Sequence, residues 1–215
     1  MTAFTPSNPL AYWMLALFAL LSAGCSSTRD PGLYLSHFQL KDPMVSDFEV
    51  CESSGCRKIS RLAYSEEEWQ SIVNIFEPAP TTSAEERARL IIAIGAMETI
   101  IGSKNGTSAD NMKNDRRVVT GPQLDCIAEA ANTTVALILL DQEGLIKHHR
   151  IGYPQHRGFF QGRLPHNTAS IFDNQTGAHY ALDSWFYAGG EPPICVPVSV
   201  WKAGYDPHKE TSSSD

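Results

Sequence analysis

The segment that most constrains the fold is residues 126–140, which are apolar on nearly every side of a helix. A surface helix carries a polar face, whereas a helix without one must be covered all round. We therefore predict a buried central helix that begins at Cys126. Asp125 is placed to cap its first turn, and Gly144 marks its end.

The last third of the chain predicts the sheet that covers this helix. Residues 146–153, 166–172 and 179–185 are strand candidates, and the last two flank a polar turn at residues 173–177. Asn and Gly in that turn supply the dihedral angles that a hairpin needs. A C-terminal antiparallel sheet is therefore expected.

The preceding part of the chain predicts one strand and two helices. Residues 57–63 alternate polar and apolar, as a strand does. Ser65 and Ser83 each begin a capping-box pattern. The first helix should last about three turns and end before Pro78, and the second should reach Gly102. The predicted fold class is α+β, with N-terminal helices and a central helix packed on the C-terminal sheet.

Composition limits the range of functions. The chain has 215 residues, 42% hydrophobic and 19% charged, with a net charge of −7. This suits one domain, expected over residues 34–215, and gives no electrostatic support for binding nucleic acid.

The N-terminus has the pattern of an export signal. Residues 10–21 are almost all apolar, but too few for the ~20 that span a bilayer. Residues 21–25 (Leu-Ser-Ala-Gly-Cys) resemble a bacterial lipobox. The resemblance implies a lipoprotein signal peptide at residues 1–24, lipid on Cys25 and a tether at residues 25–33. Ser26 would suit outer-membrane sorting in a two-membrane bacterium.

This N-terminal segment departs from an export signal in one respect. Residues 1–9 lack the Lys or Arg that such a signal usually carries. The alternative is a short membrane anchor in which Cys25 is unmodified.

Export to an oxidising compartment would favour cysteine pairing. Cys51 and Cys56 lie close in sequence, and Gly55 helps the chain between them to turn, so we expect a local disulfide. Cys126 and Cys195 would remain. A bridge between these two is the alternative that would remove any thiol chemistry.

No metal site is expected. No second Cys or His pair lies near Cys51 and Cys56 in sequence. His148 and His149 are adjacent on a predicted strand and would point to opposite faces, so both are expected at the surface, like His156. Calcium would find no acidic loop, and no cofactor is implied.

Three residues far apart in sequence form the candidate catalytic group. Cys126 begins a helix, where the partial positive charge stabilises a thiolate. His166 and Asp183 lie almost equally far from Asn174 in the turn, so they should lie across from each other on paired strands. A nucleophile, a base and an orienting acid would result.

Neighbouring residues have less certain roles. Gln123 is a candidate oxyanion donor beside the backbone N–H of Cys126, or an exposed loop residue. Cys126 alone would more often be a buried small hydrophobe. Glu129, one turn beyond Cys126, is expected at a solvated helix position; the alternative is a second polar group in the cleft. Residues 185–187 (Trp-Phe-Tyr) would line a substrate pocket or pack in the core.

The order of these motifs resembles the transglutaminase-like branch of the papain-like fold. The matching motifs are Asp125-Cys126, residues 165–168 (Pro-His-Asn-Thr) and residues 182–185 (Leu-Asp-Ser-Trp), and the resemblance covers roughly residues 84–186. It implies Cys126 as nucleophile, His166 as base and Asp183 as the residue that orients the imidazole. The tryptophan found near the family's cysteine is absent here.

Together, the lipobox resemblance and the transglutaminase-like resemblance imply an exported, lipid-anchored cysteine hydrolase or acyltransferase of the cell envelope, facing the periplasm. It would act on amide bonds of a protein or peptide-like envelope substrate through a thioester at Cys126. The alternative is a non-catalytic envelope lipoprotein that uses the fold as a binding module. The sequence separates neither these two nor hydrolysis from acyl transfer.

Overall fold

The computed structural model describes residues 30–113, 121–158 and 165–210. The predicted signal peptide, Cys25 and Ser26 lie outside the described residues. Within the described residues, no helix is both long enough and apolar enough to cross a membrane. The first helix of the described residues begins at Gly32, within the segment predicted as a tether.

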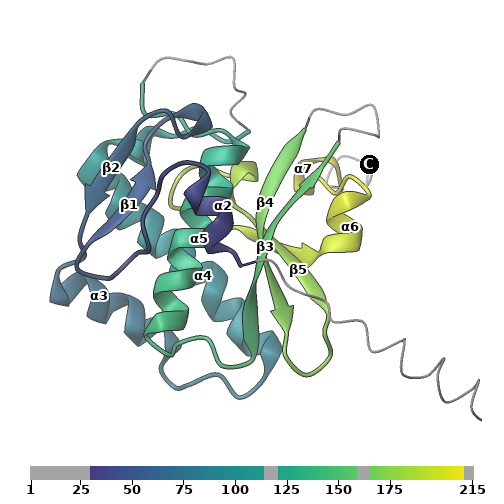
Figure 1. The fold of residues 1–215 in the computed structure, drawn as a ribbon. Coiled ribbons are helices and arrows are strands. Elements are labelled where there is room, and N and C mark those ends of the chain that lie inside the picture. Colours follow the sequence, from purple (N-terminus) through teal and green to yellow (C-terminus); the bar gives the residue numbers. More distant parts are fainter. Residues whose placement is uncertain (1–29, 114–120, 159–164, 211–215) are drawn as a thin grey trace, which may run out of the picture.

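The fold combines helices with antiparallel strands, as the α+β prediction requires (Figure 1). The helices are α2 (Gly32–Ser36), α3 (Glu66–Val73), α4 (Ser83–Asn105), α5 (Cys126–Gln142), α6 (Val198–Lys202) and α7 (Pro207–Glu210). The strands are β1 (Phe48–Cys51), β2 (Ile59–Leu62), β3 (His149–Arg157), β4 (His166–Asp173), β5 (His179–Asp183) and β6 (Ile194–Pro197). Short 3-10 turns include η1 (Ser54–Cys56), η2 (Asn74–Phe76), η3 (Thr107–Ala109) and η4 (Ser184–Phe186).

Helix α5 is the centre of the fold. It begins at Cys126, and Asp125 caps it by accepting the backbone N–H of Ala128 at 3.1 Å, which confirms both predictions. Figure 1 shows α5 between the β1–β2 hairpin and the larger sheet, and it contacts both. This position explains why the helix has no polar face.

The larger sheet has four antiparallel strands in the order β3-β4-β5-β6. The turn at residues 173–177 joins β4 to β5, as predicted. Strand β6 was not predicted; Pro192 and Pro193 precede it and Pro197 ends it. It pairs with β5 at the edge of the sheet, where missing N–H donors are tolerated.

The smaller sheet is the β1–β2 hairpin, closed by a Cys51–Cys56 disulfide. The expected local disulfide is thereby confirmed. Cys126 and Cys195 are both free, so the alternative bridge between them is wrong.

The helix caps match the sequence with one correction. Ser65 and Glu68 form the complete capping box of α3. The N-cap of α4 is Thr82 rather than Ser83, because Thr82 accepts the backbone N–H of Glu85. Helix α4 also continues past Gly102 to Asn105.

Two apolar clusters hold these elements together. The large one joins α4, α5, the hairpin and one face of the sheet. The small one forms around Phe186 and Trp201, both almost wholly buried, where α6 packs on β5 and β6. The small cluster lies beside the candidate site described next.

Candidate active site

Cys126 occupies the first position of α5, where the N-terminal end of the helix supplies partial positive charge. Its sulfur lies 3.9 Å from the carbonyl oxygen of Pro165, the residue before β4. The residue is only 5% exposed. The structure therefore brings the thiol to the start of the strand that carries His166.

The disulfide hairpin holds the start of α5 in place. The backbone N–H of Gly55 donates to Asp125 Oδ1 at 2.9 Å, the same oxygen that caps the helix. The amide of Asn132 accepts the backbone N–H of Cys51 at 2.7 Å and donates to its carbonyl at 2.9 Å. The hydrogen bonds of Asp125 and Asn132 together fix the start of α5 relative to the hairpin.

His166 and Asp183 form a buried pair. His166 Nε2 and Asp183 Oδ2 are 2.6 Å apart, and the two side chains are 7% and 1% exposed. The pairing predicted from the hairpin spacing is confirmed as a contact. The register is offset, however: Ala169 pairs with Leu182, so His166 lies diagonal to Asp183 rather than across from it.

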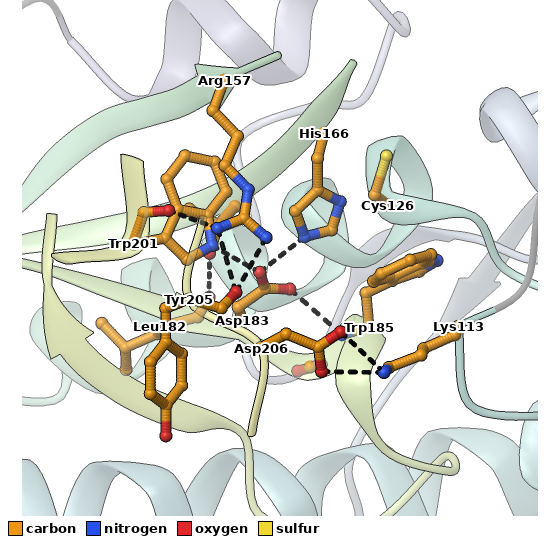
Figure 2. A network of polar contacts seen from close by, with 12 residues as sticks. Lys113, Cys126, Arg157, His166, Leu182, Asp183, Trp185, Trp201, Tyr205 and Asp206 are labelled. Carbon is orange, nitrogen blue, oxygen red and sulfur yellow. Dashed lines mark hydrogen bonds and ion pairs between the residues drawn. The ribbon is translucent and has the colours of Figure 1, made fainter. Parts of the chain in front are cut away.

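The second side of the imidazole faces the thiol. Figure 2 shows the ring of His166 with Asp183 on one side and Cys126 on the other. The order of the three groups is therefore sulfur, ring and carboxylate, which the catalytic hypothesis requires.

Aromatic side chains enclose the imidazole. Trp185 is half-buried, and its ring centroid lies 4.5 Å from that of His166. Phe186 is buried, and its ring centroid lies 5.7 Å from that of His166. Tyr187 packs instead against His208. The sequence left open whether residues 185–187 line a pocket or pack in the core. In the structure Trp185 flanks the site, whereas Phe186 belongs to the small apolar cluster.

Among the described residues, Asp183 accepts from two further donors that the sequence did not predict. The indole Nε1–H of Trp201 donates to Oδ2 at 2.7 Å, and the backbone N–H of Trp185 to Oδ1 at 3.3 Å. Trp185 lies two residues after Asp183, a spacing typical of a side-chain cap, so this bond had a local signal. The contact with Trp201 had none.

The carboxylate sets the charge of the imidazole. Burial lowers the pKa of His166, but the charge of Asp183, its hydrogen bond and the interaction with Cys126 outweigh burial and raise the pKa to about 9. His166 is therefore protonated at neutral pH.

Gln123 is held by the loop that precedes it. Its side-chain N–H donates to the carbonyl of Ala109 at 2.6 Å, and its Oε1 accepts the side-chain amide of Asn111 at 3.1 Å. These bonds tie Gln123 to residues 109–111 while it stays next to the start of α5. Its role as oxyanion donor stays a prediction.

Glu129 is buried, so the expectation of a solvated position was wrong. It is 5% exposed, and its Oε2 has no hydrogen-bond partner among the described residues. It lines a cavity of about 20 Å³ between α4 and α5, together with Glu98. Burial, followed by the charges of Glu98 and Asp110, raises the pKa of Glu129 well above its ordinary value. The raised pKa favours the neutral form of Glu129, which lies in the first turn of α5 after Cys126.

His149 corrects another expectation, because it is buried rather than at the surface. It bonds Glu86 far from Cys126, His148 lies near the carbonyl of Pro80, and His156 is exposed as predicted. No group of three or more His, Cys, Asp or Glu residues suited to a metal ion occurs in the described part of the chain.

Comparison of the chain with protein-family models, with curated proteins and with solved structures finds no match.

Proposed function

We propose that this protein is an exported, lipid-anchored cysteine enzyme of transglutaminase-like fold, which cleaves or transfers amide-linked acyl groups. The observation that carries the proposal is the His166–Asp183 pair at 2.6 Å, with Cys126 at a helix N-terminus on the other side of the ring. The Cys51–Cys56 disulfide supports an oxidising compartment.

The proposed reaction has two steps, acylation of Cys126 and release of the acyl group. The sulfur of Cys126 attacks the amide carbonyl and forms an S–C bond, and His166 gives its proton to the nitrogen as the C–N bond breaks. Water or a second amine, deprotonated by His166, then attacks the thioester and releases the thiolate. The backbone N–H of Cys126 and a second donor, with Gln123 as candidate, would hold the oxyanion.

Asp183 would keep the imidazole in its working orientation throughout. A hydrogen bond to Nε2 leaves Nδ1 to exchange the proton with sulfur and substrate. No cofactor enters these steps. The proposed substrate is a protein or peptide-like component of the cell envelope, reached from a membrane by the lipid on Cys25.

A second function, a non-catalytic envelope binding module, is favoured by one observation. Cys126 is only 5% exposed and His166 only 6%. A thiol closed to solvent would pack as a small hydrophobe and would not meet a substrate.

Alkylation of the folded protein with iodoacetamide distinguishes the two functions. Cys126 should react fast at neutral pH, as an activated catalytic thiol does. Cys195 is an internal control, because burial raises the pKa of its thiol to about 11. Mapped adducts that show Cys126 as slow as Cys195 would exclude the enzyme and favour the binding module.

Lipid anchoring has a separate test. In a two-membrane bacterial host, the wild-type protein should sediment with membranes and lack residues 1–24, whereas Cys25→Ala should keep them or become soluble. Identical fractionation and N-termini for both proteins would exclude lipid on Cys25.

A further inference from the structure

We propose that Trp201 is a positioning residue of this site, which holds the carboxylate of Asp183 in the orientation that His166 requires. The inference rests on the proposed function. Trp201 lies outside residues 84–186, the range that the family resemblance covers, so the resemblance assigns it no role.

The indole and the imidazole meet at one oxygen. Trp201 Nε1 lies 2.7 Å and His166 Nε2 2.6 Å from Asp183 Oδ2. Trp201 is 0% exposed, so the bond forms away from water, where a charge-assisted hydrogen bond is strong. Two donors at fixed positions define the direction in which Oδ2 points.

The remaining contact of Asp183 is weaker. The backbone N–H of Trp185 reaches Oδ1 at 3.3 Å, a long hydrogen bond. Without the indole, Oδ2 would be held, among the described residues, only by the imidazole that it has to orient. An indole N–H is a donor only, so Trp201 cannot take the proton that His166 carries.

Trp201 is itself anchored to the strand beside His166. Arg157 pairs with His166 in the β3–β4 ladder. Its guanidinium lies 4.4 Å from the ring of Trp201 and donates to the carbonyls of Trp201 and Tyr205 (Figure 2). Helix α6 is thereby fixed to the strands that carry the site.

The first test is Trp201→Phe in the full chain, which keeps a buried aromatic ring and removes the N–H. Alkylation of Cys126 by iodoacetamide at pH 7 should slow about 10-fold or more, the size expected for a lost bond to a charged group. The upper limb of the pH–rate profile, which reports the imidazolium, should move to lower pH. Trp69→Phe, the same change on the distant helix α3, should alter neither.

A double-mutant cycle separates positioning from packing. If Trp201 acts through Asp183, Trp201→Phe should slow alkylation of an Asp183→Ala protein no further. A packing role would instead slow both backgrounds equally and leave the shape of the pH profile unchanged. Equal slowing, a wild-type profile, or a limb that moves to higher pH would each overturn the proposal.

A measurement on the tryptophan itself covers the case in which Trp201→Phe does not fold. The indole N–H proton of Trp201, followed by NMR, should shift as His166 titrates and should move in Asp183→Asn. A resonance that ignores both changes would exclude the link. If wild-type Cys126 proves unreactive, the proposed function fails, and this resonance still tests the Trp201–Asp183 contact independently.

Discussion

The described part of the molecule contains two buried histidine–carboxylate pairs. Each pair is joined by a short hydrogen bond, but the two differ in the group that faces the second ring nitrogen. His166 and Asp183 are 2.6 Å apart, and His149 and Glu86 are 2.8 Å apart. Both pairs join a histidine of the sheet to an acid and are shielded from solvent. Burial and pairing alone therefore do not mark a catalytic histidine.

The pair formed by His149 and Glu86 is closed. Nε2 of His149 lies 3.2 Å from a guanidinium nitrogen of Arg87. A guanidinium can only donate, so His149 Nε2 accepts this hydrogen bond, and His149 Nδ1 donates to Glu86. Burial raises the pKa of Glu86, but bonds from His149, Lys147 and His148 outweigh it and leave the pKa below its ordinary value. Both ring nitrogens of His149 and both carboxylate oxygens of Glu86 are therefore occupied by hydrogen bonds within the fold.

The pair formed by His166 and Asp183 is open on one side. Its second nitrogen faces Cys126 rather than an arginine. A thiol can give up a proton, whereas a guanidinium cannot do so in a protein. The neighbour of the second nitrogen is therefore the feature that separates a candidate base from a structural histidine.

The largest expected effect of a mutation is on reactivity at the open pair. His166→Ala should slow alkylation of Cys126 at pH 7 by roughly 100-fold to 10,000-fold, the usual contribution of a positioned base. His149→Ala, assayed on the folded fraction, should leave the alkylation rate of Cys126 within about twofold of the wild-type rate. Similar slowing by both substitutions would erase the distinction between the pairs.

The next effect is on stability at the closed pair. Glu86→Ala leaves His149 and two backbone N–H groups without their acceptor, and breaking a buried pair costs about 3 to 5 kcal/mol. Urea unfolding should show this loss. Glu67→Ala, at an exposed position on α3, is the control and should stay within about 0.5 kcal/mol. A loss below about 1 kcal/mol for Glu86→Ala would contradict the structural role.

The open pair should also make stability depend on pH. The folded pKa of His166 is about 9, above its ordinary value of 6.5. Protonation of His166 therefore stabilises the fold fully below pH 6.5, and this contribution is lost as pH rises through 9. The difference corresponds to about 3 kcal/mol, to be measured by urea unfolding at pH 6 and 9.5.

Asp183→Asn provides the control for that pH dependence. It removes the charge that raises the pKa of His166, so most of the loss between pH 6 and 9.5 should disappear. An unchanged slope in this variant would mean that other groups cause the dependence.

Features set by neighbouring residues were predictable from the sequence. Asp125 caps α5, the turn at residues 173–177 joins two strands, and Cys51 bonds Cys56, because each signal lies within a few residues. The hairpin spacing even brought His166 to Asp183, although the true register makes them diagonal neighbours.

Features set by contacts between distant segments were not predictable. Trp201 reaches Asp183 only because α6 packs back onto the sheet, and no local sequence pattern predicts that packing. Glu129 was expected in solvent because a single acid on a helix usually lies there, but α4 covers it with Glu98. His149 was misplaced for the same reason, since its partner Glu86 belongs to α4.

The smallest expected effect comes from opening the closed pair, with Arg87→Met. Arg87 is 20% exposed, lies 3.7 Å from Asp173 and stacks on Tyr180 at 4.2 Å, so its loss should cost about 1 kcal/mol at pH 8.

Urea unfolding at pH 8 should therefore show a smaller loss for Arg87→Met than for Glu86→Ala. Arg89→Met, the same change two residues along α4, removes none of these three contacts and should cost less than Arg87→Met. An equal cost for the two arginine variants would show that the contacts of Arg87 do not stabilise the closed pair. The identity of the second partner would then not explain the difference between the pairs.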